Sequence, residues 1–387
     1  MKIAKSVYRL GTEAVYNIFA KTKKLAKQGK KIIDLSLGQS DFKTPRHVVN
    51  ATIQALKDGH HGYTLPNGII ECREAVSRKI KSLYNAKISA ERIVIMPGGK
   101  PTMHYAISFF GEPGAEIIYP DPGFPIYESM INYTGAIAVP YNLNEKRDFS
   151  IDSDKVLSLI NEKTRLIILN NPHNPTGSFT EKKVIDKLVE GLMNFPDVTI
   201  LSDEIYDRLI FDKKEIPTML NYPKFYDRLI VLNGWSKTYA MTGWRLGWGV
   251  WPEQLIEHVF KFCVNNHSCV NTAAQYGAIT ALDGPEDHLN DMMKEFNIRR
   301  KLIIDGLKSL KGIECSLPGG SFFVFPNVKG TGMDGEEFTE RCLQKAGVAM
   351  IPGTAFGKFA TNHVRFNFAT SRENISKAIE KIDKILK

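Results

Sequence analysis

Short apolar runs alternate along the chain with longer stretches in which apolar residues recur at helical spacing. Six runs between residues 92 and 250 predict strands, at 92–96, 116–120, 164–169, 198–201, 229–232 and 246–250. Pro-Gly-Gly at 97–99 ends the first of them before a helix that we expect from Pro101. The runs hardly alternate between apolar and polar positions, as expected for strands that are buried on both faces. The pattern therefore predicts an α/β fold with a parallel or mixed sheet between helices.

The pattern changes after about Gly284. A long amphipathic helix is expected at about 285–310, followed by short strands at 322–325, 348–351 and 363–368 and a terminal helix from Glu373. We interpret residues 39–284 as a large domain and residues 285–387 as a smaller α/β domain. The N-terminal segment 1–38 is expected to join the smaller domain.

Length and composition agree with a two-domain globular protein. The chain has 387 residues, which is long for one compact core, and 43% of them are hydrophobic. The formal net charge of +9 favours an anionic ligand but also suits an ordinary surface. The densest basic run, between Lys21 and Lys31, has no interleaved aromatic residues, so we expect a solvated helix face and no nucleic-acid partner.

Cysteine usage and hydropathy indicate a cytoplasmic protein. The five cysteines show neither a CxxC pair nor metal-ligand spacing, which predicts reduced thiols and no metal site. The N-terminus lacks the apolar core of a signal peptide, and no apolar run approaches the roughly 18 residues of a membrane span. We expect no membrane partner.

The strongest chemical signal is the run SKTYAMTGWR at 236–245, which lies between two predicted strands. Lys237 comes just after a strand in an apolar and aromatic setting, where a lysine can have a depressed pKa and attack a carbonyl. Arg245 follows eight residues later, and its guanidinium suits a phosphate. This edge of an open α/β sheet is where ligands bind.

Together with two further motifs, this run resembles the fold-type-I class I/II aminotransferases over nearly the whole chain. The motifs are NPHNPTG at 171–177, which resembles the family's NPxNPTG signature, and SDEIY at 202–206. The resemblance implies a seven-stranded, mainly parallel sheet with a smaller α/β domain. It also implies pyridoxal 5′-phosphate as the cofactor, attached to Lys237 as a Schiff base.

The resemblance also assigns residues around the cofactor ring. Asp203 would pair with the protonated pyridine nitrogen and so keep the ring an electron sink. Tyr206 and Asn174 would hydrogen-bond the 3′-oxygen, although Asn174 also suits a turn between two prolines. Phe124 would stack on one ring face and Ile205 would cover the other, although an aromatic residue at 124 also fits plain core packing.

The phosphate of the cofactor is expected at the turn between the first strand and the following helix. Gly99 and Lys100 lie where backbone N–H groups point at an anion, and Ser236 and Arg245 would add donors. Tyr63, in the run GYTLPNG, resembles the family tyrosine that reaches the phosphate of a neighbouring subunit. That resemblance implies a homodimer with shared active sites, against the alternative of an ordinary loop tyrosine.

The substrate carboxylate has two expected partners. Arg365, in the run HVRF, resembles the family arginine that clamps the α-carboxylate, and a strand arginine between apolar residues would be costly if unpaired. Gly38, in the run LGQSDF, resembles the glycine whose backbone approaches the same group.

The implied reaction transfers the amino group of an L-amino acid to a 2-oxo acid such as 2-oxoglutarate. A lysine at the position of Lys100 binds the distal carboxylate in a subgroup that resembles aspartate and prephenate aminotransferases, which favours a dicarboxylic donor. That subgroup usually has a threonine where this chain has Val15. Aromatic or other neutral amino acids therefore stay open as donors, and Lys100 also suits a role at the phosphate alone.

Two other functions share parts of this pattern. A β-eliminating lyase, or an enzyme like aminocyclopropane-carboxylate synthase, would carry the same motifs and differ in its products. The effector-binding half of a transcription regulator also borrows this fold, but it follows a winged helix-turn-helix. Here the family pattern begins at about residue 10, which disfavours a regulator.

Overall fold

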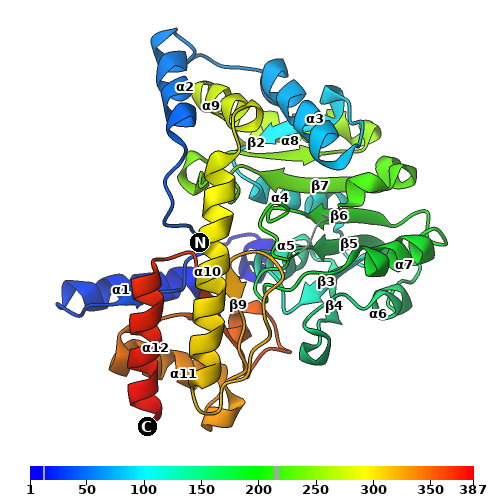
Figure 1. Ribbon diagram of the computed structural model, residues 1–387. Helices are drawn as coiled ribbons and strands as arrows, with labels where there is room; N and C mark the ends of the chain where they lie inside the picture. The colour runs from blue at the N-terminus through cyan, green and yellow to red at the C-terminus, as the bar shows by residue number, and fades with distance from the viewer. Residues whose placement is uncertain (12–13, 213–217) are drawn as a thin grey trace.

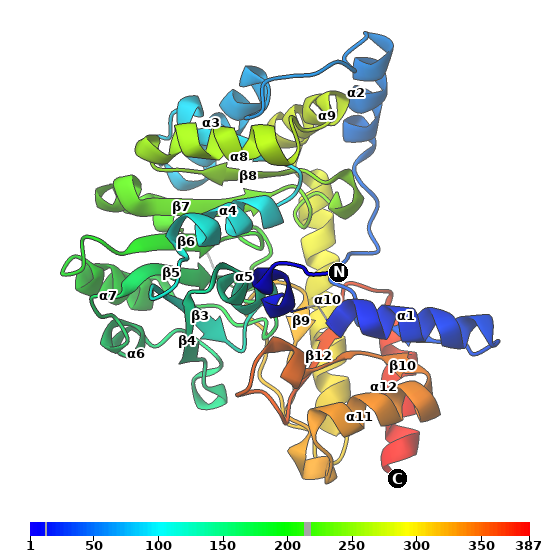
Figure 2. The same ribbon diagram turned by 180° about the vertical axis from the view of Figure 1, so that it is seen from behind.

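The computed structural model describes residues 1–11, 14–212 and 218–387, apart from the side chains of residues 14–17, 19 and 26. Figure 1 shows a broad sheet with helices on both faces, and Figure 2 shows the same arrangement from behind. A long helix leads from this sheet to a second group of elements, which also contains the first helix of the chain.

The large sheet has seven strands, and six of them are parallel. Their order across the sheet is β2 (Ile93–Met96), β8 (Gly247–Val250), β7 (Leu229–Gly234), β6 (Thr199–Asp203), β5 (Thr164–Asn170), β3 (Glu116–Asp121) and β4 (Ile137–Asn142). Only β8 runs antiparallel to its neighbours. The predicted seven-stranded, mainly parallel sheet is thus confirmed. The edge strand β4 has no counterpart among the six predicted runs, because it is half exposed and contains Pro140.

Helices cover both faces of this sheet, which explains why its strands do not alternate between apolar and polar residues. In β6, for example, Ile200 packs into one core and Leu201 into the other. The first core includes side chains of α3 (Ile70–Tyr84), α6 (Ser153–Ser158), α7 (Lys182–Leu192) and α9 (Thr272–Asp283). The second includes side chains of α4 (Lys100–Phe110), α5 (Ile126–Thr134) and α8 (Ile256–Asn266). The helix α2 (Arg46–Lys57) packs on α9.

The second group of elements has its own apolar core, centred on the long helix α10 (Asp287–Ser309). Its strands are β1 (Ile33–Asp34), β9 (Phe323–Val324), β10 (Val348–Ala349), β11 (Ile351–Pro352) and β12 (Val364–Asn367). Its other helices are α11 (Gly335–Arg341) and α12 (Arg372–Leu386). The N-terminal segment contributes α1 (Ala14–Lys27) and β1, which pairs with β10. The division into domains at 38 and 284 stays a prediction.

One predicted strand of this group is wrong in detail. The run 348–351 is two short strands that belong to different sheets, since β10 pairs with β1 and β11 pairs with β12. Met350 separates them and is fully buried. Apolar content alone does not reveal where a short buried run changes its pairing partner.

Two further observations concern possible metal ligands and membrane-spanning helices. The five cysteines are unpaired, and among the described residues no group of three His, Cys, Asp or Glu side chains is placed to hold a metal ion. No helix in the described part of the chain is both long and apolar enough to cross a membrane.

Candidate active site

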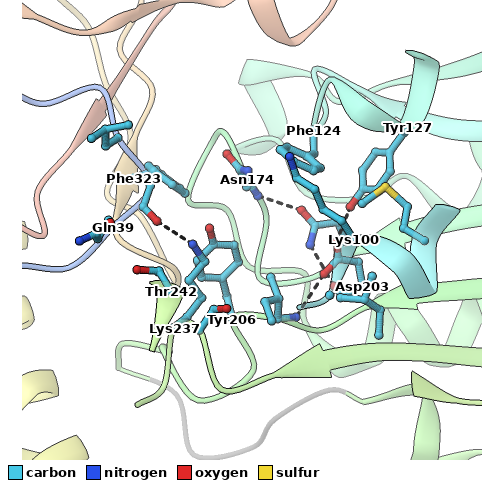
Figure 3. Close-up of a pocket in the computed structure, with 18 of the residues that line it drawn as sticks. Gln39, Lys100, Phe124, Tyr127, Asn174, Asp203, Tyr206, Lys237, Thr242 and Phe323 are labelled. Atoms are coloured by element: carbon cyan, nitrogen blue, oxygen red, sulfur yellow. Dashed lines mark hydrogen bonds between the residues drawn. The ribbon is translucent and has the colours of Figure 1, made fainter. Parts of the chain in front are cut away.

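A cavity of about 510 Å³ lies where β5, β6 and β7 end at their carboxyl edge. Figure 3 shows side chains from several of these strand ends pointing toward one another. The cavity brings together every predicted site residue except Tyr63: Gly38, Gly99, Lys100, Phe124, Asn174, Asp203, Ile205, Tyr206, Ser236, Lys237, Arg245 and Arg365. Strand order at this edge explains the convergence, because parallel strands deliver their following loops to one side of the sheet.

Lys237 follows β7 and points into this cavity (Figure 3). Its Nζ donates a hydrogen bond of 2.6 Å to the carbonyl oxygen of Gly38 and lies 5.7 Å from the ring centroid of Tyr206. Burial, together with the nearby cations of Arg365 and Arg245, lowers the pKa of the Lys237 amine to about 8, although the Asp203 carboxylate acts in the opposite direction. An amine with such a pKa is partly neutral, and therefore nucleophilic, near physiological pH.

This lowered pKa predicts unusual reactivity toward acylating reagents. At pH 7 about one Lys237 amine in ten should be neutral, against about one in 2,500 for an ordinary lysine. In protein freed of bound cofactor, peptide mapping after reaction with a limiting amount of a small amine-directed acylating reagent should therefore find Lys237 among the fastest-labelled lysines. Its labelling rate should rise with pH and level off above about pH 8, whereas ordinary lysines accelerate up to about pH 10. A profile for Lys237 that follows the bulk lysines would contradict the lowered pKa.

Asp203 is the last residue of β6 and is 5% exposed. Its Oδ2 accepts a hydrogen bond of 2.6 Å from the Tyr127 hydroxyl, and its Oδ1 accepts one of 3.2 Å from the backbone N–H of Ile205. Burial raises the pKa of the Asp203 carboxyl to about 6, while these two donors act against the shift. The group is a buried acceptor whose charge is most stable beside a cation.

The turn between β2 and α4 forms a cradle of backbone beside Arg245. Gly98 has a φ of +90°, and a Cβ on it would lie 2.2 Å from an Nη atom of Arg245. Gly99 is the N-cap of α4, and Arg245 donates a hydrogen bond of 2.7 Å to the Thr242 carbonyl. A helix N-terminus beside a guanidinium is an arrangement that binds anions, phosphate above all.

Arg365 enters the cavity from β12. Its guanidinium donates to Asn174 Oδ1 at 2.9 Å and to the Ser36 carbonyl at 2.7 Å. The guanidinium carbon lies 4.3 Å from the ring centroid of Phe323 and 4.7 Å from that of Phe356. A buried guanidinium that is held by two hydrogen bonds and lies near two aromatic rings is a suitable partner for a carboxylate.

Lys100 begins α4 and faces the cavity from the side of the glycine turn. Its Nζ lies 5.4 Å from the ring centroid of Phe124, which is half buried. The cation is near enough to Lys237 to lower the pKa of that amine. Phe124 and Ile205 both line the cavity, so an aromatic and an aliphatic side chain are available to a flat ligand.

Two residues from the sequence analysis are not placed in the cavity. Tyr63 is not among its lining residues and is 92% exposed in the loop between α2 and α3. Val15 belongs to α1, but its side chain lies outside the described part of the chain.

The cavity also contains residues that the sequence analysis did not identify, among them Gln39, Tyr127, Asn170, Thr242 and Phe323. Tyr127 belongs to the run DPGFPIY, in which only Phe124 was selected. Asn170 accepts a hydrogen bond from the backbone N–H of Asn174 at 2.9 Å and so orders the loop after β5. Gln39 and Thr242 do belong to motifs noted in the sequence, but their own side chains gave no separate signal.

These contacts define the chemistry that the cavity supports. A partly neutral lysine, a buried carboxylate, a phosphate cradle and a carboxylate clamp converge on one space. The first can form a covalent bond to an aldehyde, and the other three can each hold a different charged part of a ligand.

Comparisons with known proteins agree with this arrangement. A family model described as aminotransferase class I and II matches residues 30–382. A probable aspartate aminotransferase of Methanocaldococcus jannaschii is 38% identical over 91% of this chain and 93% of its own. The aromatic-amino-acid aminotransferase 2 of Thermococcus litoralis is 33% identical over 92% of both chains. The crystal structure of the aspartate aminotransferase from Rhizobium meliloti is similar with a TM-score of 0.95, at 28% identity, covering 100% of this chain and 99% of that one.

Proposed function

Because the chain belongs to the class I and II aminotransferases, we propose that it binds pyridoxal 5′-phosphate at Lys237 and moves an amino group from an L-amino acid to a 2-oxo acid. The observation that carries the proposal is the lowered pKa of the Lys237 amine in a cavity that also contains the Asp203 carboxylate and the Arg365 guanidinium.

The residues of the cavity fit this cofactor at three points. The absence of a side chain at Gly98 lets the Arg245 guanidinium lie against this turn, and the turn presents a helix N-terminus to a phosphate. Asp203 is a buried carboxylate suited to a protonated pyridine nitrogen. Phe124 and Ile205 line the space where a flat ring would lie between them.

When bound, the cofactor supplies an electron sink for the pair of electrons left after the α-proton departs. Asp203, held by Tyr127, would keep the pyridine nitrogen protonated. Arg365 would bind the substrate α-carboxylate and fix the orientation of the α-carbon. The Lys237 amine, once released, would move the proton from that α-carbon.

A homodimer is part of the proposal. Tyr63 would reach the phosphate site of a neighbouring subunit, and its 92% exposure leaves it available to do so. Two apolar side chains close to Tyr63 in the sequence, Leu56 and Leu65, are more than half exposed. A cytoplasmic location is also proposed, and the five unpaired cysteines agree with a reducing compartment.

The direct test of the function is a screen of amino donors against 2-oxoglutarate, oxaloacetate and pyruvate, with both products followed. Transamination predicts one new amino acid for each new oxo acid. Release of ammonia with pyruvate would instead identify a β-eliminating lyase, and a cyclised product would identify an enzyme of the aminocyclopropane-carboxylate synthase type. Absence of cofactor binding and of all these products would overturn the proposal.

For the donor we favour aspartate or another dicarboxylic amino acid, with aromatic and neutral amino acids as the alternative. The support for a dicarboxylic donor is the Lys100 ammonium at the cavity wall, where it could meet a distal carboxylate. The same ammonium also lies at the N-terminus of α4, where it could serve the phosphate instead. The relatives of this chain include both an aspartate aminotransferase and an aromatic-amino-acid aminotransferase, so the role of Lys100 must be tested by substitution.

Replacement of Lys100 by alanine separates these roles. If Lys100 binds the distal carboxylate of the substrate, kcat/KM for aspartate or glutamate should fall about 30- to 1000-fold in Lys100→Ala, which corresponds to roughly 2–4 kcal/mol. The value for a neutral donor should then change far less. Lys100→Met is the matched variant, because it keeps an unbranched stem against Phe124 and removes only the charge. Equal losses for acidic and neutral donors, together with weaker cofactor binding, would remove the dicarboxylate hypothesis.

A further inference from the structure

Residues 36–41, called the strap from here on, connect β1 to the segment before α2 and pass beside the cavity. Leu37, Gly38 and Gln39 line the cavity. Figure 3 shows Gln39 on the side of Lys237 that faces away from the large sheet. The strap therefore brings backbone, rather than a charged side chain, next to the amine of Lys237.

Gly38 is the point of closest approach between the strap and Lys237. Its carbonyl oxygen accepts the hydrogen bond of 2.6 Å from Lys237 Nζ. A Cβ on Gly38 would lie 3.3 Å from Cζ of Phe323 and 3.8 Å from Lys237 Nζ. The absence of a side chain at position 38 lets the carbonyl reach the amine without displacing Phe323.

Asn367 holds the strap on both sides of this carbonyl. It ends β12 and is 4% exposed. Its side-chain nitrogen donates to the carbonyl of Leu37 and, at 3.2 Å, to the carbonyl of Gln39. Its Oδ1 accepts the backbone N–H of Ala369 at 2.7 Å, which fixes the orientation of the amide. The carbonyls before and after Gly38 thus bind Asn367, and the carbonyl of Gly38 itself binds Lys237.

The strand β12 also binds the first residue of the strap and the residue before it. Arg365 lies two residues before Asn367, so the two side chains leave the same face of the strand. Arg365 donates to the Ser36 carbonyl, and the backbone N–H of Asn367 donates to the Leu35 carbonyl at 2.8 Å. The strand β12 therefore carries Arg365, which would bind the substrate carboxylate, and also holds the strap in position.

We propose that Asn367 is a positioning residue that holds the Gly38 carbonyl as the hydrogen-bond acceptor for the Lys237 amine. The inference rests on the proposed function, because it concerns how that amine is held before it captures the cofactor and again when the substrate releases it. An amine that must move a proton between fixed atoms benefits from an acceptor that limits its rotamers. An amide nitrogen has two N–H donors, so it can bind both flanking carbonyls at once, whereas a hydroxyl has one.

The test compares Asn367→Ala and Asn367→Ser with the wild-type protein and with Asn327→Ala. Asn327 is a matched control, because its side-chain nitrogen also makes a partly buried bond, of 2.9 Å, to Glu145 and lies outside the cavity. For each full-length protein freed of cofactor, the absorbance change on adding pyridoxal phosphate gives the rate of capture by Lys237. The Tm and the kcat and KM of transamination are then measured on the reloaded proteins.

Asn367→Ala should slow cofactor capture about tenfold and lower kcat by about ten- to a hundredfold, with KM for the donor changed less than about threefold. Asn367→Ser should recover part of both losses. Asn327→Ala should lose a similar amount of Tm and keep its capture rate and kcat within about twofold of wild type.

Three results would overturn the inference: wild-type capture and kcat in Asn367→Ala, equal losses in Asn327→Ala, or a loss confined to KM. If Asn367→Ala does not fold, Asn367→Ser decides in the same way, since capture as fast as wild type contradicts the proposal. Failure of the proposed function looks different, because the wild-type protein itself would then neither capture the cofactor nor transaminate.

Discussion

Replacement of Lys237 by alanine should lower kcat/KM for transamination by at least about 10⁴-fold, because the variant loses both a covalent attachment point and a proton carrier. The contacts around Lys237 indicate that the fold should survive. Among the described residues its amine makes one hydrogen bond, to the Gly38 carbonyl, and burial works against its charge. Removing a buried amine with a lowered pKa should therefore cost little stability, and Tm should fall by only a few degrees.

Chemical trapping tests the same assignment independently of rate. Borohydride reduction of the wild-type protein with bound cofactor, followed by peptide mapping, should place the label in the peptide that contains Lys237. Lys100→Ala is the control, because Lys100 lines the same cavity and its loss should leave the label in place. A label on Lys100, or on any lysine other than Lys237, would refute the assignment.

Replacement of Asp203 by asparagine is expected to leave the cofactor bound and to lower kcat by about 10²- to 10³-fold. A neutral amide cannot hold the pyridine nitrogen protonated, and the loss of one preorganised electrostatic partner typically costs about 3–4 kcal/mol in the transition state. The substitution keeps the size of the side chain, and Tyr127 can still donate to its oxygen. Asp203→Asn should therefore retain the fold while it loses rate.

Glu204 provides the matched control for this experiment. It is the next residue along the chain and is also a buried carboxylate, and burial raises its pKa to about 7. Its oxygens accept from Ser202, Thr218 and the backbone N–H of Met219, and among the described residues it does not line the cavity. Glu204→Gln should lower Tm and leave kcat within about tenfold. Activity of Asp203→Asn within tenfold of wild type, or equal losses in both variants, would tell against Asp203 as the partner of the ring.

Six of the seven strands of the large sheet were predictable because each is a short run whose residues are mostly buried on both faces. In β6, neighbouring isoleucine and leucine side chains enter two different cores, and the resulting continuous apolar run is visible without a structure. The edge strand β4 was not predicted because its partial exposure and its proline weaken the same signal. The division of the run 348–351 into β10 and β11 was not predicted, because it depends on which distant strand each half pairs with.

In the candidate site, too, the residues that belong to local motifs were predictable, whereas their contacts with distant residues were not. The motifs fixed which residues stand at strand ends, so Lys237, Asp203 and Asn174 could be selected from the sequence. The hydrogen-bond partners of these residues could not be predicted from the sequence. Lys237 binds a carbonyl 199 residues away, and Asp203 binds a hydroxyl 76 residues away.

By itself, then, the sequence determined the order of the elements, the family resemblance and most of the side chains that face the cavity, because these follow from local spacing and motif. Only the tertiary structure decided that Tyr127 orients Asp203 and that Asn367 brackets the Gly38 carbonyl. It also decided that Tyr63 stands outside the cavity of its own chain. Such pairings depend on how strands and loops far apart in the chain are packed, and hydrogen bonds between them leave no periodic pattern in the sequence.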